Sequence, residues 1–151
     1  MSVRLLIVWL HVVGVVVWVG GLMYQAHVLA PAARGGNVAM FADLARRGRA
    51  AAWTAIAVVV LTGFYNVTQL GSVERAMQSG AGLLLVAKFG LVILAVALAG
   101  QRDFAQLTIL RHAVDSGADP TSTLKTITRL DRIVLTLSIV IVYLGLAISR
   151  A

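Results

Sequence analysis

Four long apolar stretches constrain the fold of this chain more than any other feature of its sequence. A helix that spans a bilayer needs about 20 mainly apolar residues. Four segments of the 151-residue chain meet that requirement, namely residues 5–30, 51–70, 81–100 and 130–149. Hydrophobic residues make up 60% of the sequence, whereas a soluble domain is about half apolar. We therefore predict an all-α fold, an integral membrane four-helix bundle embedded in the lipid bilayer, with residues 1–151 forming a single transmembrane domain.

The segment between the first two stretches has an amphipathic pattern of its own. The first helix is expected to end near Pro31, and Gly35-Gly36 provides a flexible joint. Val38, Phe41 and Leu44 then recur at helical spacing, followed by a cluster of arginines. This pattern predicts a short amphipathic interfacial helix over residues 37–49, lying on the inner leaflet where anionic lipid attracts arginine.

Positive charge is distributed unevenly between the two sides of the expected bundle. Arg4, Arg75 and Arg150 lie on the side that holds both termini and the short loop 71–80. Nine basic residues lie with loops 31–50 and 101–129: Arg34, Arg46, Arg47, Arg49, Arg102, Arg111, Lys125, Arg129 and Arg132. The positive-inside rule then places these two loops in the cytoplasm and both termini outside, in a bacterial or archaeal cytoplasmic (inner) membrane. The charge of +7 is explained by this topology, so nucleic-acid binding is not predicted.

Two ionisable residues lie deep within predicted spans, where such residues are candidates for function. His11 comes six positions after Leu5, and Lys88 comes seven positions after Ala81. Both spans start on the outer side, so both side chains are expected roughly 9–11 Å below the outer helix ends. The sequence therefore predicts a site at which His11 of the first helix faces Lys88 of the third.

Further residues are expected at the same site. At 100° per residue, His11 shares a helix face with Gly14, Trp18 and Gln25. A small residue such as Gly14 leaves space for a bulky planar group or for a close helix. Tyr65 and Tyr143 fall in the same outer half, so that each helix contributes one polar side chain. The candidate cofactor-binding residues are therefore His11, Lys88, Gly14, Trp18, Tyr65 and Tyr143, with His11 as the metal ligand and no catalytic residue assigned.

The chemistry of these side chains favours haem b over copper as the bound group. Imidazole is a common axial ligand of haem iron, and a nearby ammonium can neutralise a haem propionate. Copper also suits imidazole, but Met23, Met40 and Met77 are dispersed along the chain. The alternatives stay open at this stage: a structural histidine bonded across helices, and a lysine that extends to the surface.

The cysteine and histidine content of the chain limits which metal and cofactor sites are possible. The chain has no cysteine, which excludes disulfides, thiolate metal sites, iron–sulfur clusters and haem attached through cysteines. His27 lies about 24 Å along the first helix from His11 and cannot join that site. His27 and His112 are both expected on the cytoplasmic side, as a second site or as two unrelated surface residues.

The first helix resembles the signature of the CopD/HemJ-like membrane proteins. The resemblance lies in Trp9-Leu10-His11 followed by an apolar run and Trp18-Val19-Gly20-Gly21, and in Ala87-Lys88-Phe89-Gly90-Leu91-Val92. HemJ-like members are four-helix proteins that bind haem b and oxidise protoporphyrinogen, which implies His11 and Lys88 as the corresponding positions. CopD-like members are assigned to copper uptake or export. Ala30-Pro31 and Ala99-Gly100-Gln101-Arg102 depart from the HemJ-like pattern, so the chain resembles the CopD branch more closely.

From the residues and the resemblance together we expect a membrane protein that binds haem b and has a redox role. That role would be electron transfer with a quinone or a redox partner subunit, or the oxidation of a porphyrinogen by a haem-dependent membrane oxidoreductase. The first alternative is a CopD-like copper transport protein that uses His11 with methionines. The second is an accessory transmembrane subunit of a respiratory complex. A homo-oligomer and a complex subunit are both compatible with the sequence.

Overall fold

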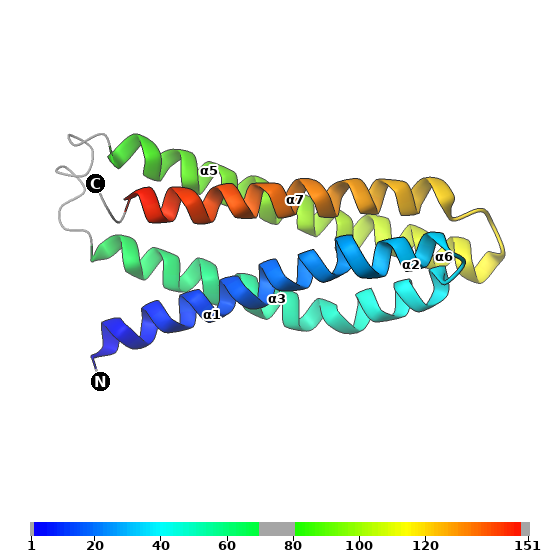
Figure 1. Cartoon of the computed structure of the whole chain (residues 1–151), viewed down its shortest axis with the longest axis horizontal. Helices are drawn as coiled ribbons and strands as arrows, with labels where there is room; N and C mark the ends of the chain where they lie inside the picture. The colour runs from blue at the N-terminus through cyan, green and yellow to red at the C-terminus, as the bar shows by residue number, and fades with distance from the viewer. Residues whose placement is uncertain (1, 70–80, 149–151) are drawn as a thin grey trace.

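Four helical rods run antiparallel through the chain in the computed structural model, which describes residues 2–69 and 81–148 (Figure 1). Within these residues four helices are long and apolar enough to cross a membrane: Val3–Arg34, Val38–Thr68, Gly82–Ser116 and Thr121–Ile148. The prediction of an all-α membrane bundle of four helices is confirmed. The predicted loop 71–80, with Arg75, and the C-terminal Arg150 lie outside the described residues.

Two of the four rods contain a π-helical segment. The first rod consists of α1 (Val3–Tyr24), the π-helix η1 (Gln25–Leu29) and α2 (Ala30–Arg34). The third consists of α5 (Ala81–Gly100), the π-helix η2 (Gln101–Gln106) and α6 (Leu107–Ser116). The second and fourth rods are single helices, α3 (Val38–Thr68) and α7 (Thr121–Ile148). The third rod ends at Gly117, whose φ of +70° glycine adopts without strain.

The rods are arranged as two pairs, with α1 packed along α3 and α5 along α7, while α1 also contacts α7. One end of the bundle holds the start of α1, the end of α3, the start of α5 and the end of α7 (Figure 1); we call it the His11 end. The opposite end holds α2, α6 and the start of α7; we call it the α6 end.

Two clusters of buried apolar side chains hold the rods together. The cluster near the middle of the bundle consists of Trp18, Leu22, Ala26, Ala55, Ile56, Ala95, Ala99, Val134, Leu135 and Ile141. The cluster at the α6 end consists of Leu29, Ala30, Ala33, Phe41, Ala42, Ala45, Leu107, Leu110, Leu124 and Ile127. Many of these residues are alanines, and small side chains let membrane helices approach closely.

The predicted boundary between an interfacial helix and the second span is wrong. Residues 38–68 form one uninterrupted helix, α3, and its first turns extend the second rod. The apolar face of residues 37–49 packs against α2 and α6, and Phe41 is fully buried there. Amphipathic periodicity shows only that one face of a helix is apolar. Here the protein itself covers that face, because the third rod continues past Gly100 as α6 and lies beside it.

Gly14 lies at a close contact between α1 and α3. A Cβ added to Gly14 would lie 2.8 Å from Cγ2 of Val59 and 3.4 Å from the carbonyl oxygen of Ala55. We expect Gly14→Ala to push the two helices apart and to lower the free energy of unfolding by about 1–3 kcal/mol, the usual cost of overpacking. Thermal unfolding of the purified protein in detergent measures this change.

Gly20→Ala is the matched control for this prediction. Gly20 lies on the same helix, and no atom comes within 4 Å of the position that a Cβ would take. This variant should unfold at the wild-type temperature or slightly above it, because alanine favours a helix over glycine. Equal stability of the two variants would show that α1 and α3 do not meet at Gly14.

Candidate functional site

His11 of α1 is bonded across the bundle to Thr62 of α3. Its Nδ1 lies 2.9 Å from the Thr62 hydroxyl oxygen, which itself donates to the carbonyl oxygen of Val58 at 2.5 Å. A hydroxyl has only one proton to donate. The Thr62 oxygen therefore accepts a hydrogen bond from a protonated Nδ1, and the neutral ring keeps its lone pair at Nε2. This arrangement fixes the tautomer that a metal ligand needs.

Lys88 reaches the same end of the bundle from α5. Its Nζ lies 3.0 Å from the position that a Cβ on Gly145 of α7 would take, so it extends over the surface of the neighbouring helix. Gly63 of α3 similarly makes room for the ring, since a Cβ there would lie 3.4 Å from Cε1 of His11. His11 and Lys88 are near enough for their charges to interact. The structure thus brings together the two ionisable residues that the sequence placed at equal depth.

The other residues predicted for this site take different positions. Gly14 is covered by α3, as described above. Trp18 is buried in the central apolar cluster, one turn further along α1. Tyr65 is partly buried on α3, whereas Tyr143 is 69% exposed. Tyr143 therefore faces outward from the single chain, and the structure does not gather all four helices around one polar level.

The space over Gly14, one turn from His11, is too small for the planar group that was expected there. The planar group was expected over Gly14, but Val59 and Ala55 of α3 fill that space. Of the two roles considered for Gly14, the structure shows the close helix. The residues around Gly14 leave no room for a haem between α1 and α3, and a haem between His11 and Lys88 of α5 stays a prediction.

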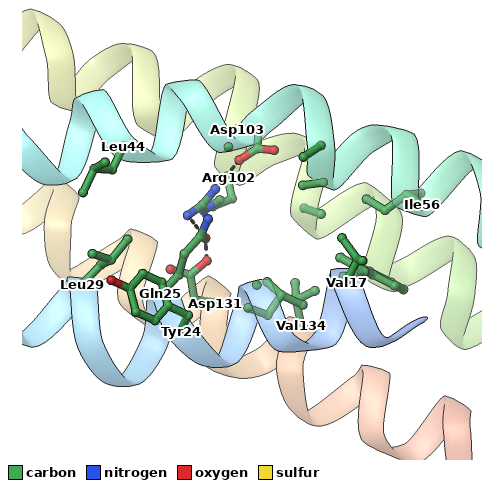
Figure 2. A pocket seen from close by; sticks show the side chains of 17 residues that line it. Val17, Tyr24, Gln25, Leu29, Leu44, Ile56, Arg102, Asp103, Asp131 and Val134 are labelled. Atoms are coloured by element: carbon green, nitrogen blue, oxygen red, sulfur yellow. Dashed lines mark hydrogen bonds and ion pairs between the residues drawn. The ribbon is translucent and has the colours of Figure 1, made fainter. Parts of the chain in front are cut away.

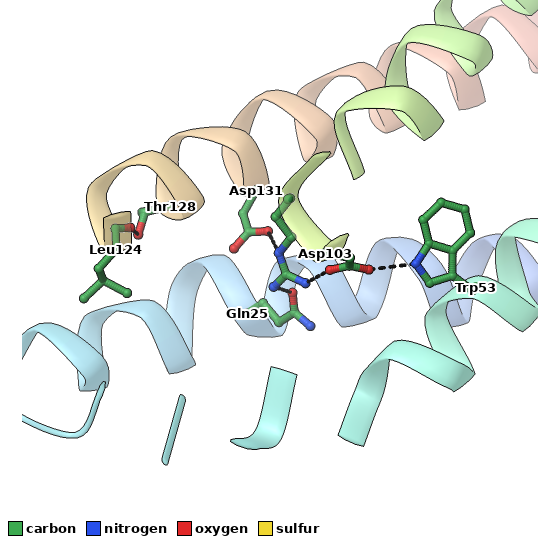
Figure 3. Close-up of polar contacts among 7 residues, drawn as sticks. Gln25, Trp53, Asp103, Leu124, Thr128 and Asp131 are labelled. Carbon is green, nitrogen blue, oxygen red and sulfur yellow. Dashed lines mark hydrogen bonds and ion pairs between the residues drawn. The ribbon is translucent and has the colours of Figure 1, made fainter. Parts of the chain in front are cut away.

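A buried ionic network lies in the half of the bundle toward the α6 end (Figure 3). At its centre the Arg102 guanidinium bonds to Asp103 and to the side-chain oxygen of Gln25. Its Nε lies 2.9 Å from Oδ1 of Asp131. The indole N–H of Trp53 donates to Oδ2 of Asp103 at 2.8 Å. The network therefore links all four rods in a region where the three charged residues are at most 5% exposed.

The two π-helical segments supply most of this network. Gln25 is the first residue of η1, and Arg102 and Asp103 belong to η2. Both segments contact α7, which carries Asp131. A π-helical turn contains more residues than an α-helical turn, so it changes which side chains face the interior, and such turns are frequent at functional sites.

A cavity of about 360 Å³ opens beside the network (Figure 2). Its apolar wall includes Trp18, Leu22, Ile56 and Val134. Its polar wall is formed by Tyr24, Gln25, Arg102, Asp103 and Asp131. Oδ2 of Asp131 is buried and has no hydrogen-bond partner among the described residues. The chamber thus combines an apolar surface with a buried carboxylate that accepts no hydrogen bond from the described residues.

Sequence reasoning missed the network because it assigned Arg102 to a cytoplasmic loop. Two signals were present. Arg102 and Asp103 continue the stripe of Ala95 and Ala99 at helical spacing, which the structure shows buried. On α7 the buried stripe consists of Leu124, Ile127, Asp131, Val134, Ser138 and Ile141, at alternating spacings of three and four residues. Asp131 therefore falls on the apolar face of its helix.

The remaining candidate metal ligands are dispersed. Within residues 2–69 and 81–148, no three His, Asp or Glu side chains form a group that could hold a metal ion. Met23 and Met40 are about half exposed. His27 and His112 are both exposed, and Nδ1 of His27 lies 3.1 Å from the carbonyl oxygen of Met23. Any metal at the His11 end would have His11 as its imidazole ligand from this chain.

These features define a class of protein: a four-helix membrane bundle with a part-buried histidine and lysine at one end and a buried ionic network toward the other. The family model described as "CopD: Copper resistance protein D" matches residues 42–148, which include Lys88 and the three charged residues of the network. The chain belongs to the CopD family. Neither the curated proteins nor the solved structures contain a match to it.

Proposed function

We propose that this protein moves copper ions in the membrane and that His11 binds the ion in passage through Nε2. Membership of the copper resistance family is the observation that supports copper. The bond to Thr62 supports the ligand role, because it leaves Nε2 as the free lone pair of a neutral imidazole. Imidazole is a suitable ligand for copper.

The small number of ligands suits a passing ion better than a resident one. A transport site must bind its ion strongly enough to admit it and weakly enough to release it. His11 is the one histidine placed at its end of the described bundle, and Met23 lies 12 residues further along the same rod, about 18 Å away. Lys88 nearby adds positive charge, which repels a bound cation and favours its release.

The test is copper flux into proteoliposomes that contain the purified full-length chain. His11→Ala should reduce the initial rate of copper(I) entry by more than about tenfold, since even mutations of residues that support a metal ligand commonly cost 10–100-fold in affinity. His27→Ala is the matched control, because His27 lies on the same rod but is exposed and contacts the Met23 carbonyl oxygen. It should transport copper at the wild-type rate.

Two outcomes would contradict the proposal. One is equal copper entry for His11→Ala and wild type. The other is a purified protein that carries haem, with a Soret band that is shifted or lost in His11→Ala but not in His27→Ala. That second result would restore the redox role expected from the sequence. Both are measured on the same preparations.

A further inference from the structure

The charges of the buried network do not balance. Asp103 and Asp131 are two carboxylates that share the single guanidinium of Arg102. Gln25 and Trp53 complete the network without adding charge. If both carboxylates were ionised, the cluster would carry one net negative charge. Such a charge buried inside the bundle is costly unless a positive charge compensates it.

Within the part of the chain that the structure describes, no other cation is paired with the cluster. Arg49 of α3 lies over the ring of Phe104, with its guanidinium carbon 5.3 Å from the ring centroid. The structure contains no ion pair between Arg49 and either carboxylate. The one other titratable group in the cavity wall is Tyr24 of α1, whose phenol carries no positive charge in either protonation state. The positive charge that would balance the second carboxylate must therefore come from outside the network.

The hydrogen bonds identify the carboxyl group that would take this charge. Both oxygens of Asp103 have partners, Oδ1 in Arg102 and Oδ2 in Trp53. Asp131 forms an ion pair with Arg102 through Oδ1, but neither of its oxygens accepts a hydrogen bond from the described residues, although the side chain is 1% exposed. Asp131 lines the cavity of about 360 Å³, which far exceeds the ~10–15 Å³ that one water molecule needs.

We propose that Asp131 is a proton-binding site that exchanges its proton with water in this cavity. On uptake an O–H bond forms at Oδ2 with a proton taken from a cavity water, and on release the same proton returns to water. Arg102 stays bound to Asp103 and Gln25 in both states. A neutral Asp131 therefore leaves no unpaired charge, because Arg102 and Asp103 balance each other.

This site is independent of copper binding at His11, which lies at the opposite end of the bundle. It gives the protein a group that can gain and lose a proton inside the helical bundle. A carboxyl group of this kind allows proton movement to accompany a transport step. The chemistry requires no electron transfer and no co-reactant other than water.

Infrared difference spectroscopy of the full-length protein in lipid tests the proposal. At pH 7 the wild type should show the carbonyl stretching band of a protonated buried carboxyl, and the band should shift in D₂O because water reaches the cavity. Asp131→Asn should remove the band. Asp115→Asn is the control, since Asp115 is exposed on α6, and it should leave the band unchanged.

A second variant protects the test against a failure to fold. Asp131→Glu retains a titratable group, so it should keep a protonated-carboxyl band at a shifted frequency. Absence of the band from the wild type, or its persistence in Asp131→Asn, would overturn the proposal. A band that appears only after sodium and potassium are removed would also overturn it, because a bound alkali cation would then supply the positive charge.

Discussion

Arg102→Gln is expected to lower the free energy of unfolding by about 3–5 kcal/mol, the usual cost of breaking a buried ion pair by removing one partner. The guanidinium bonds to Asp103, Asp131 and Gln25 within the bundle. Its loss leaves at least one carboxylate buried without a compensating charge. Denaturant or thermal unfolding of the purified protein in detergent measures the loss.

Two further variants separate this effect from a general loss of positive charge. Arg129→Gln removes an exposed arginine of α7 and should change stability little, as surface substitutions usually do. The double variant Arg102→Gln with Asp103→Asn removes one charge of each sign and should recover part of the stability. A double variant as unstable as the sum of its two single variants would show that the residues do not interact.

Phe41→Ala is expected to cost about 3–5 kcal/mol, as is usual for a buried phenylalanine. The side chain is fully buried in the apolar cluster at the α6 end, where α3 meets α2 and α6. If residues 37–49 instead lay on the lipid surface, removal of the ring would weaken membrane contact and leave the bundle almost as stable as before. The variant therefore distinguishes packing within the protein from an interfacial helix.

Met40→Ala is the neighbouring control for this prediction. Met40 precedes Phe41 on α3, and its side chain is 47% exposed. We expect little loss of stability on thermal unfolding. Similar losses in Phe41→Ala and Met40→Ala would mean that the first turns of α3 do not pack as the structure shows.

The sites at the two ends of the bundle differ in how far the sequence predicted them. At the His11 end, two ionisable residues within apolar stretches were visible directly, and helical rise placed them at one depth. The residues that they contact were not visible, because Thr62 and Gly145 belong to other helices and resemble ordinary span residues. The role of Gly14 stayed open for the same reason, since only the position of α3 decides what fills the space beside it.

The network toward the α6 end escaped sequence analysis for a different physical reason. A charged residue beside an apolar stretch ordinarily marks the membrane surface. Arg102, Asp103 and Asp131 lie near such boundaries, and their burial depends on partners that are distant in the sequence. Their helical spacing within the buried stripes of α5 and α7 was a usable signal. Such spacing shows which face of a helix is buried, but it does not show which residue of another helix lies against that face.

The sequence by itself determined the four membrane helices, the absence of cysteine chemistry and the two deep ionisable residues, because apolar length and side-chain identity are local properties. The tertiary structure alone decided that α6 covers Phe41, that Thr62 fixes the His11 tautomer, and that one arginine is shared by two buried aspartates. These features depend on the packing of one rod against another. No pattern along a single helix specifies which neighbour it meets.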